Sequence, residues 1–192
     1  LYAVMEDGTI VRGESNIPNF NNRIEKVFYQ RKVEPTREAL QAIHEADVIV
    51  YGIGSLYTSI MPNLIVDGVV EQLRSNTVKK IYFCNAMTQP GETDDFTLED
   101  HVAAIQKHSF PEAVDIVITH NNRASDHILK KYKEMGSEPV RVAQKEHSYQ
   151  ILYRDVLNFD DDLIRHDSNK IRDVLGEIIN SKDEEECLLQ QK

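Results

Sequence analysis

Cysteine is scarce in this chain of 192 residues, and long apolar runs are missing. The two cysteines, Cys84 and Cys187, give neither a metal-ligand spacing nor a disulfide framework, which suits a cytoplasmic protein. No run of roughly 18 apolar residues occurs, so we expect no membrane-spanning helix. No basic and apolar leader is visible at the start either. These absences suit an ordinary cytoplasmic globular domain.

Basic residues are also fewer than acidic residues. The chain has 22 Lys and Arg against 32 Asp and Glu, a formal net charge of −10. Nucleic acids and anionic membranes require a basic face, so we expect neither as a partner. An anionic small ligand stays compatible with this charge, because a local cluster of amides, hydroxyls and one arginine can override the distant field. The seven histidines form no H-x-x-x-H pair on an expected helix, so no metal site is predicted.

Strand and helix patterns alternate from about residue 47 onward. Before that point, Asp7 and Gly8 favour a hairpin turn, and a third short strand is expected at 24–29. Strands are then expected at 47–51, 80–85, 114–119 and near Val140 and Ile151, and helices at 36–46, 65–75, 97–107, 125–135 and from Asp167. We therefore predict a three-layer Rossmann-like α/β domain over residues 1–182, with a mostly parallel sheet, an N-terminal β-hairpin and a charged tail at 183–192.

A glycine-containing turn follows the strand expected at 47–51, which reads as a buried parallel strand. Residues 52–63 read G-I-G-S-L-Y-T-S-I-M-P-N. Two glycines let the backbone turn sharply and approach a ligand closely, and in open α/β sheets ligands bind beyond the carboxyl ends of the strands. Backbone amides after Gly54 suit a diphosphate at a helix N-terminus. A bare G-x-G is equally compatible with an ordinary strand-to-helix turn.

Polar side chains also follow the next two strands. Asn and Gln carry donors and acceptors in one plane, which matches a nucleobase edge or sugar hydroxyls. The candidate ligand-binding residues of the three loops are Gly52, Gly54, Ser55, Thr58, Ser59, Asn85, Thr88, Gln89, Asn121 and Asn122, with His120 beside them. Glu92, Asp94 and Asp95 could hold Mg²⁺ through ligand phosphates, but a solvated acidic loop with one helix-capping role is the favoured interpretation. No serine or cysteine triad is evident, so the catalytic residues are unknown.

Two long strings resemble a known family. The string from Gly52 to Gly68 and the string C-N-A-M-T-Q-P-G-E-T-D from Cys84 are similar to the CofD/YvcK family, in its YvcK branch of gluconeogenesis factors. Arg165-His-Asp also fits, and the matches run from about Tyr2 to Leu175. The family's opening strand and its G-G-G-T-G-L loop have no counterpart here. We therefore interpret the chain as the C-terminal part of a longer protein.

The resemblance implies a cytoplasmic bacterial regulatory protein that binds a UDP-sugar, such as UDP-N-acetylglucosamine or UDP-glucose. Such a protein would link gluconeogenic growth to cell-wall synthesis and cell shape through regulatory or cell-wall partners, and a homodimer is compatible with it. The resemblance adds Tyr132, a stacking face for uracil, and Arg165, a fork for a diphosphate, to the ligand site. The alternative is a CofD-like transferase that uses a nucleotide-diphosphate donor and Mg²⁺. Binding is favoured because no nucleophile or base is evident and the clearest family carboxylates lie in the absent segment.

Overall fold

The computed structural model describes residues 1–20, 22–143 and 146–189. Its main sheet has four parallel strands in the order β4-β5-β6-β7. These strands are β4 (Val48–Tyr51), β5 (Lys79–Phe83), β6 (Ile116–His120) and β7 (Gln150–Arg154). The predicted α/β class and mostly parallel sheet are therefore confirmed.

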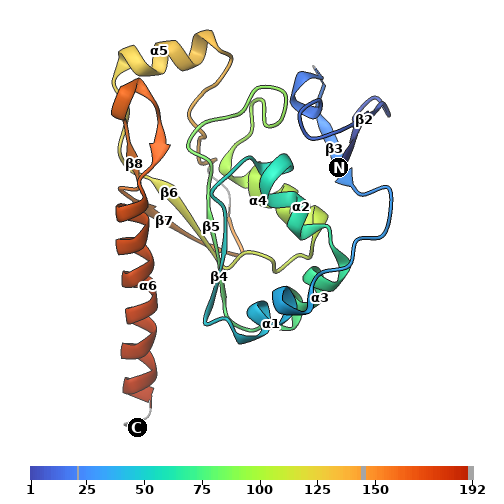
Figure 1. Ribbon diagram of the computed structural model, residues 1–192. Helices are drawn as coiled ribbons and strands as arrows, with labels where there is room; N and C mark the ends of the chain where they lie inside the picture. Colours follow the sequence, from blue (N-terminus) through green and yellow to red (C-terminus); the bar gives the residue numbers. More distant parts are fainter. Residues whose placement is uncertain (21, 144–145, 190–192) are drawn as a thin grey trace.

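Helices cover both faces of this sheet (Figure 1). On one face, Tyr82 and Val117 pack with α2 (Met61–Leu64), α3 (Asp67–Ser75) and α4 (Leu98–His108). On the other face, Ile81 and Ile118 pack with α6 (Ser168–Leu189). Successive strand residues point to opposite faces, so a strand that is apolar throughout requires a helical layer on each side. This arrangement gives the expected three layers.

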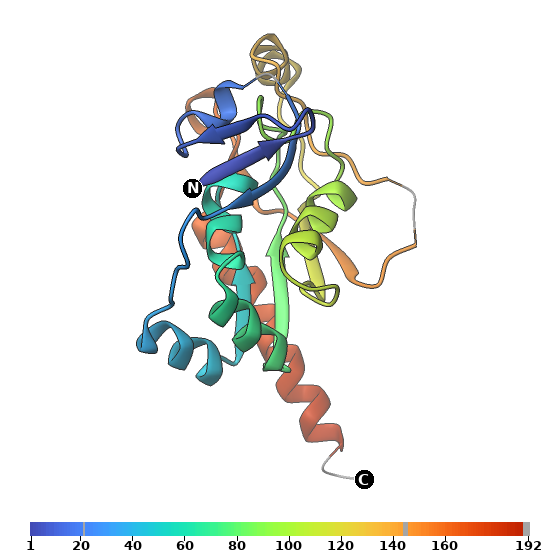
Figure 2. The same cartoon turned by 90° about the vertical axis from the view of Figure 1, so that its right-hand side faces the viewer.

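The predicted N-terminal hairpin is also present. Strands β1 (Tyr2–Met5) and β2 (Ile10–Arg12) are antiparallel, and β3 (Ile24–Phe28) pairs with the other edge of β1. A short 3-10 turn, η1 (Ile17–Asn19), lies between β2 and β3. This small sheet lies beside α2 and α4, on the side of the main sheet that faces away from α6 (Figures 1 and 2).

Side-chain caps fix the starts of three helices where the sequence predicts them. Thr36 accepts a hydrogen bond from the Ala39 amide at the start of α1 (Arg37–Glu45). Thr97 and Asp100 form a reciprocal capping box at α4. Ser125 caps α5 (Asp126–Glu134), which stands at the carboxyl end of the sheet beside a hairpin of β8 (Leu157–Asn158), η3 (Asp160–Asp162) and β9 (Arg165–His166) (Figure 1). The caps satisfy amides that would otherwise lack partners.

Four expectations about these elements were inaccurate. Strand β4 lies at the edge of the sheet, so it is not fully buried, and Val50 is 38% exposed. Helical structure resumes directly after the glycine turn, as the π-helical turn η2 (Leu56–Ile60) and then α2, well before residue 65. Near Val140 the described chain forms only isolated bridges, because it pairs with loop residues and not with the sheet. Helix α6 continues to Leu189, into the expected tail.

No helix among the described residues is both long and apolar enough to cross a membrane.

Candidate ligand-binding site at the carboxyl ends of the strands

The glycine turn after β4 is tightly packed. Gly52 has a φ of +102°, and a Cβ atom there would lie 3.2 Å from the Phe83 carbonyl oxygen. A Cβ atom on Gly54 would lie 2.8 Å from Cβ of Ser59, a separation that real Cβ atoms essentially never show. Glycine is therefore required at both positions by the close approach of neighbouring chain. The approach of a ligand to this turn, which the sequence predicts, stays a prediction.

Glu92 occupies the start of the helical segment that follows this turn. Its carboxylate accepts hydrogen bonds from the Tyr57 amide (3.2 Å), the Thr58 hydroxyl (2.9 Å) and the Gln89 side-chain amide (3.0 Å). Glu92 is only 3% exposed, so the expectation of a solvated acidic loop was wrong for this residue. The Tyr57 amide, one of the amides that would suit a diphosphate, already binds a carboxylate of the protein itself.

Burial raises the pKa of Glu92 above its ordinary value of 4.5, and the hydrogen bond from Thr58 opposes this shift. We expect Glu92→Gln to lower the free energy of unfolding by about 1–3 kcal/mol at neutral pH, because the new NH₂ group would face a donor. A raised pKa in the folded state contributes stability that is present below pH 4.5 and lost as the pH rises through the folded pKa. The stability gap between wild type and variant should therefore narrow from pH 4 to pH 7.

Urea unfolding across this pH range measures the gap directly. Glu138→Gln, at an exposed position, is the matched control and should leave stability nearly unchanged. A gap for Glu92→Gln that stays constant from pH 4 to pH 7 would contradict the raised pKa.

The loop after β5 is tied to the glycine turn by Asn85. Its side-chain amide donates to the Gly54 carbonyl oxygen (3.0 Å) and its Oδ1 accepts from the Tyr82 hydroxyl (2.8 Å). Thr88 has a different role, because it is buried and its hydroxyl accepts from the Glu138 amide (2.9 Å). Among the hydroxyls that the sequence singles out, those of Ser55 and Ser59 make no hydrogen bond within the described residues. The predicted loops are thus brought together, but several of their side chains serve to hold the loops in place.

A cavity of about 320 Å³ lies at the carboxyl ends of β5 and β6. It is mostly apolar, and its volume falls within the range of small-molecule sites. The lining residues come from the loop after β5 (Ala86, Met87), the loop after β6 (His120, Asn121, Asn122, Arg123, Ala124), Leu129 of α5, Pro139, and the β8–β9 hairpin region (Leu157, Phe159, Ile164). Two of the predicted site residues, Asn121 and Asn122, therefore line it.

Asn122 and His120 shape one wall of this cavity. The Asn122 side-chain amide donates to Oδ1 of Asp155 (2.6 Å) and to the Leu157 carbonyl oxygen (3.0 Å). Nδ1 of His120 donates to the Asn122 carbonyl oxygen (2.9 Å). These bonds fix the loop after β6 against the β8–β9 hairpin, so the wall is held in place before a ligand binds.

Tyr132 and Arg165 lie beside this cavity without lining it. The Tyr132 hydroxyl on α5 accepts a hydrogen bond from the Ile164 amide (2.9 Å), and Ile164 does line the cavity. Arg165 follows Ile164 on β9 and is exposed. Both residues are thus at the end of the sheet where the loops after β5 and β6 meet, although the turn at Gly54 does not border this cavity.

Sequence reasoning missed several contributors to this region. Leu129, Phe159 and Ile164 are ordinary apolar residues from distant segments, and no local pattern marks them as cavity residues. Arg123 directly follows Asn121 and Asn122, so continuing that polar run by one residue would have found it. Asp94 accepts from the Gly91 amide (2.8 Å) and Asp95 is exposed; no group of three metal-ligating side chains occurs within the described ranges.

Comparison with known proteins gives a consistent result. The profile of the CofD family, described as 2-phospho-L-lactate transferase CofD, matches residues 1–157. The gluconeogenesis factor of Halalkalibacterium halodurans is 43% identical over 183 residues, which cover 92% of this chain and 56% of that protein. The gluconeogenesis factor of Bacillus subtilis strain 168 is 38% identical over 183 residues, which cover 93% of this chain and 58% of that protein.

A solved structure agrees with these relatives. The crystal structure of a UPF0052 family member from Bacillus halodurans superposes with a TM-score of 0.85 at 42% identity, over 90% of this chain and 57% of that one. The chain therefore spans less than three-fifths of the length of the relatives it matches.

Proposed function

This chain belongs to the CofD family, where its relatives carry the name gluconeogenesis factor, and from that premise we propose that it binds a nucleotide-sugar and acts as a regulator. The ligand class that we propose is a UDP-sugar, UDP-N-acetylglucosamine or UDP-glucose, and the regulated process is cell-wall synthesis and cell shape during gluconeogenic growth. The observation that carries the proposal is the apolar cavity of about 320 Å³ at the ends of β5 and β6. A flat base would bury its faces there.

Binding without turnover is favoured because the potentially reactive side chains are buried or already hydrogen-bonded. Cys84 is 2% exposed, and burial raises the pKa of its thiol to about 12, so it is a poor nucleophile. Glu92 is committed to capping the helical segment after the glycine turn. The second candidate is a transferase that uses a nucleotide-diphosphate donor and Mg²⁺, and the CofD family profile supports it. We derive no catalytic step for it from the residues described.

Calorimetry of the full-length protein against a panel of nucleotide-sugars, with and without Mg²⁺, tests this proposal. We expect saturable binding of UDP-N-acetylglucosamine or UDP-glucose, with the ligand recovered intact by mass spectrometry after hours. Multiple-turnover release of a nucleotide product would favour the transferase. Absence of binding to every nucleotide-sugar in the panel would reject both the ligand class and the site.

Tyr132 and Arg165 provide a residue-level prediction. Neither residue lines the cavity, so in this proposal the ligand extends past the cavity to reach them. A stacked base is worth about 1–3 kcal/mol and a charge-assisted hydrogen bond about 1.5–3 kcal/mol, so either alanine variant should weaken UDP-sugar binding by about tenfold or more. Tyr132→Phe distinguishes the loss of ring stacking from the loss of the tyrosine hydrogen bond. It keeps the ring and leaves only the Ile164 amide without its acceptor. It should cost about 1 kcal/mol of stability and little affinity.

Exposed residues outside the site supply the matched controls, Tyr153→Ala and Arg172→Ala. Both controls should bind UDP-sugars as the wild type does. Equal affinity of Tyr132→Ala and wild type would remove this tyrosine from the ligand site.

A further inference from the structure

One charged side chain lines the cavity at the carboxyl ends of β5 and β6. Arg123 is the only Lys, Arg, Asp or Glu among the twelve described residues that surround this cavity. Its side chain is 77% exposed, so the guanidinium is accessible to a ligand from solvent. An apolar cavity beside a single exposed cation suits a ligand that joins an apolar or flat group to an anionic group.

The guanidinium of Arg123 binds a carboxylate that can be exchanged for a ligand. Its Nη2 donates to Oδ1 of Asp126 (2.8 Å), the first residue of α5. The Asp126 side chain is 91% exposed, and ion pairs between such exposed side chains are weak. A diphosphate offers several oxygens to the planar guanidinium, which binds them in a two-pronged, charge-assisted manner. An anionic ligand can therefore replace Asp126 at Arg123 with a net gain.

The loop that carries Arg123 is held in place by the strands beside it. The backbone amide of Asn121 donates to the Arg154 carbonyl oxygen (3.0 Å), and the side-chain amide of Asn122 donates to the Leu157 carbonyl oxygen (3.0 Å). The backbone before Arg123 is thus fixed, while the exposed side chain can still move. Binding of a ligand at Arg123 then requires little ordering of the backbone.

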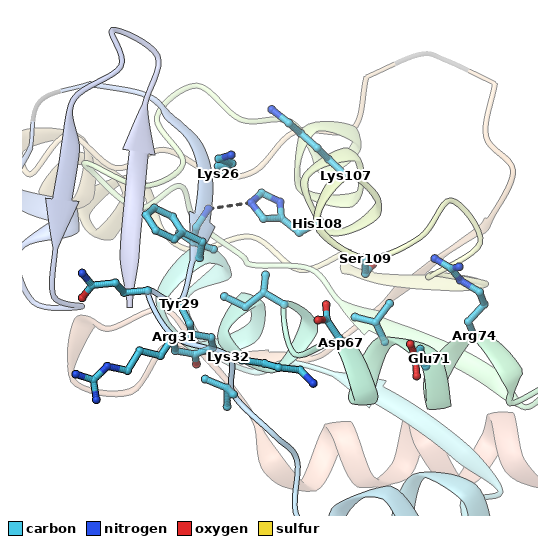
Figure 3. Close-up of a pocket in the computed structure, with 16 residues that line it drawn as sticks. Lys26, Tyr29, Arg31, Lys32, Asp67, Glu71, Arg74, Lys107, His108 and Ser109 are labelled. Carbon is cyan, nitrogen blue, oxygen red and sulfur yellow. Dashed lines mark hydrogen bonds between the residues drawn. The ribbon is translucent and has the colours of Figure 1, made fainter.

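A second concentration of positive charge lies elsewhere, in a groove of about 800 Å³ between β3, α3 and the end of α4 (Figure 3). Its lining includes two carboxylates and five cations, which are Lys26, Arg31, Lys32, Arg74 and Lys107. Figure 3 shows these cations spaced around the groove, and none of the candidate ligand-binding residues lines it. This groove is therefore the alternative position for an anionic ligand, and the experiment below has to distinguish the two.

We propose that Arg123 binds the diphosphate of the nucleotide-sugar beside the cavity, in exchange for Asp126. This inference rests on the ligand class proposed above and adds Arg123 to the anion-binding residues of the same site. Asp126 then competes with the ligand for one guanidinium. Its carboxylate lowers the affinity for the ligand, because the ion pair has to break before the diphosphate binds.

Calorimetry of the full-length protein with UDP-N-acetylglucosamine tests both residues of the pair. Arg123→Gln should weaken binding by about tenfold or more, and Arg123→Lys by less, because lysine keeps the charge and loses the two-pronged geometry. Asp126→Asn should strengthen binding by about twofold to fivefold. Weaker binding in Asp126→Asn would overturn the exchange.

A second exposed ion pair supplies the matched controls. Arg172 binds Asp173 at the same distance of 2.8 Å, both side chains are exposed, and neither residue lines the cavity. Arg172→Gln and Asp173→Asn make the same changes in charge as the two variants at the cavity. Both controls should bind UDP-N-acetylglucosamine as the wild type does, and equal effects at the two ion pairs would overturn the proposal.

Uridine, which has no phosphate, separates recognition of the anion from support of the loop. Competition against UDP-N-acetylglucosamine gives the affinities of UDP and of uridine. Their ratio should fall by about tenfold in Arg123→Gln and stay unchanged in Arg172→Gln. An equal loss of affinity for UDP and for uridine in Arg123→Gln would show that Arg123 only supports the loop, and would overturn the proposal.

The remaining outcomes distinguish this inference from the proposed function. If the wild type binds UDP-N-acetylglucosamine and Arg123→Gln binds it equally well, the inference is wrong and the proposed function stands. If the wild type binds no nucleotide-sugar, both are rejected. Lys26→Gln combined with Arg31→Gln, in the groove of Figure 3, should bind as the wild type does. A loss of affinity confined to that double variant would place the diphosphate in the groove and overturn the proposal.

Discussion

Replacing Gly91 with alanine is expected to lower the free energy of unfolding by about 3–5 kcal/mol, an unusually large loss for one methyl group. Gly91 has a φ of +79°, and a Cβ atom there would lie 1.8 Å from the Pro18 carbonyl oxygen and 2.6 Å from its carbonyl carbon. Both contacts are with backbone, which cannot rotate away as a side chain can. The 3-10 turn η1 and the loop carrying Gly91 would have to separate.

Variants at two other glycines separate the steric clash with Pro18 from the conformational penalty of a positive φ. Gly8 has a similar φ of +83°, but no atom lies within 4 Å of the point that a Cβ atom would occupy, so Gly8→Ala should cost only the conformational penalty of about 1–2 kcal/mol. Gly176 lies inside α6 with open space around it, and Gly176→Ala should stabilise by about 0.5–1 kcal/mol. Urea unfolding of the three variants gives the comparison; equal losses for Gly91→Ala and Gly8→Ala would show that Pro18 does not approach Gly91.

The contact matters for the site because Gly91 precedes Glu92. Pro18, in the 3-10 turn η1 between β2 and β3, lies against the loop that carries Glu92, whose carboxylate accepts a hydrogen bond from the Tyr57 amide. A displaced loop would therefore release the start of the helical segment after the glycine turn. We expect η1 to hold this loop in place, although η1 contributes none of the candidate ligand-binding residues.

Local signals account for the parts of the fold that the sequence predicts well. Thr36, the Thr97–Asp100 pair and Ser125 each act on amides three residues away, so their capping roles can be predicted without knowing the fold. The apolar runs at β5 and β6 predict strands that are covered on both faces, and both are covered. The positions of the loops at the strand ends follow from these elements.

Contacts between distant segments account for what the sequence does not predict. The exposure of Val50 depends on whether a further strand lies beside β4, which the residues of β4 do not encode. Glu92 accepts a hydrogen bond from the Thr58 hydroxyl, 34 positions away in the sequence, and no pattern near either residue predicts this contact. The helical turns at 56–64 were not predicted, although Pro62 lies in the first turn of α2, where proline is well tolerated.

Replacing Gly54 with valine is expected to weaken binding of UDP-N-acetylglucosamine by about a hundredfold or more, which corresponds to about 2.7 kcal/mol. The first added carbon would lie 2.8 Å from Cβ of Ser59 and 3.3 Å from its Oγ, so the turn must shift away from the helical segment. That shift would break the hydrogen bond from Asn85 to the Gly54 carbonyl oxygen and displace the loop after β5, which borders the cavity. We expect a loss of stability of a few kcal/mol with the fold retained.

Ile53→Val is the matched control for this change, because Ile53 is 54% exposed in the same turn and should tolerate a smaller side chain without loss of affinity. Calorimetry on both variants, after circular dichroism has established that each is folded, measures the difference. If folded Gly54→Val binds the UDP-sugar as tightly as wild type, the glycine turn is not part of the ligand site. The cavity at the ends of β5 and β6 would then have to hold the ligand without it, and Tyr132→Ala would still weaken binding. Loss of affinity in Gly54→Val together with unchanged affinity in Ile53→Val would show that ligand binding at the cavity depends on the geometry of the turn.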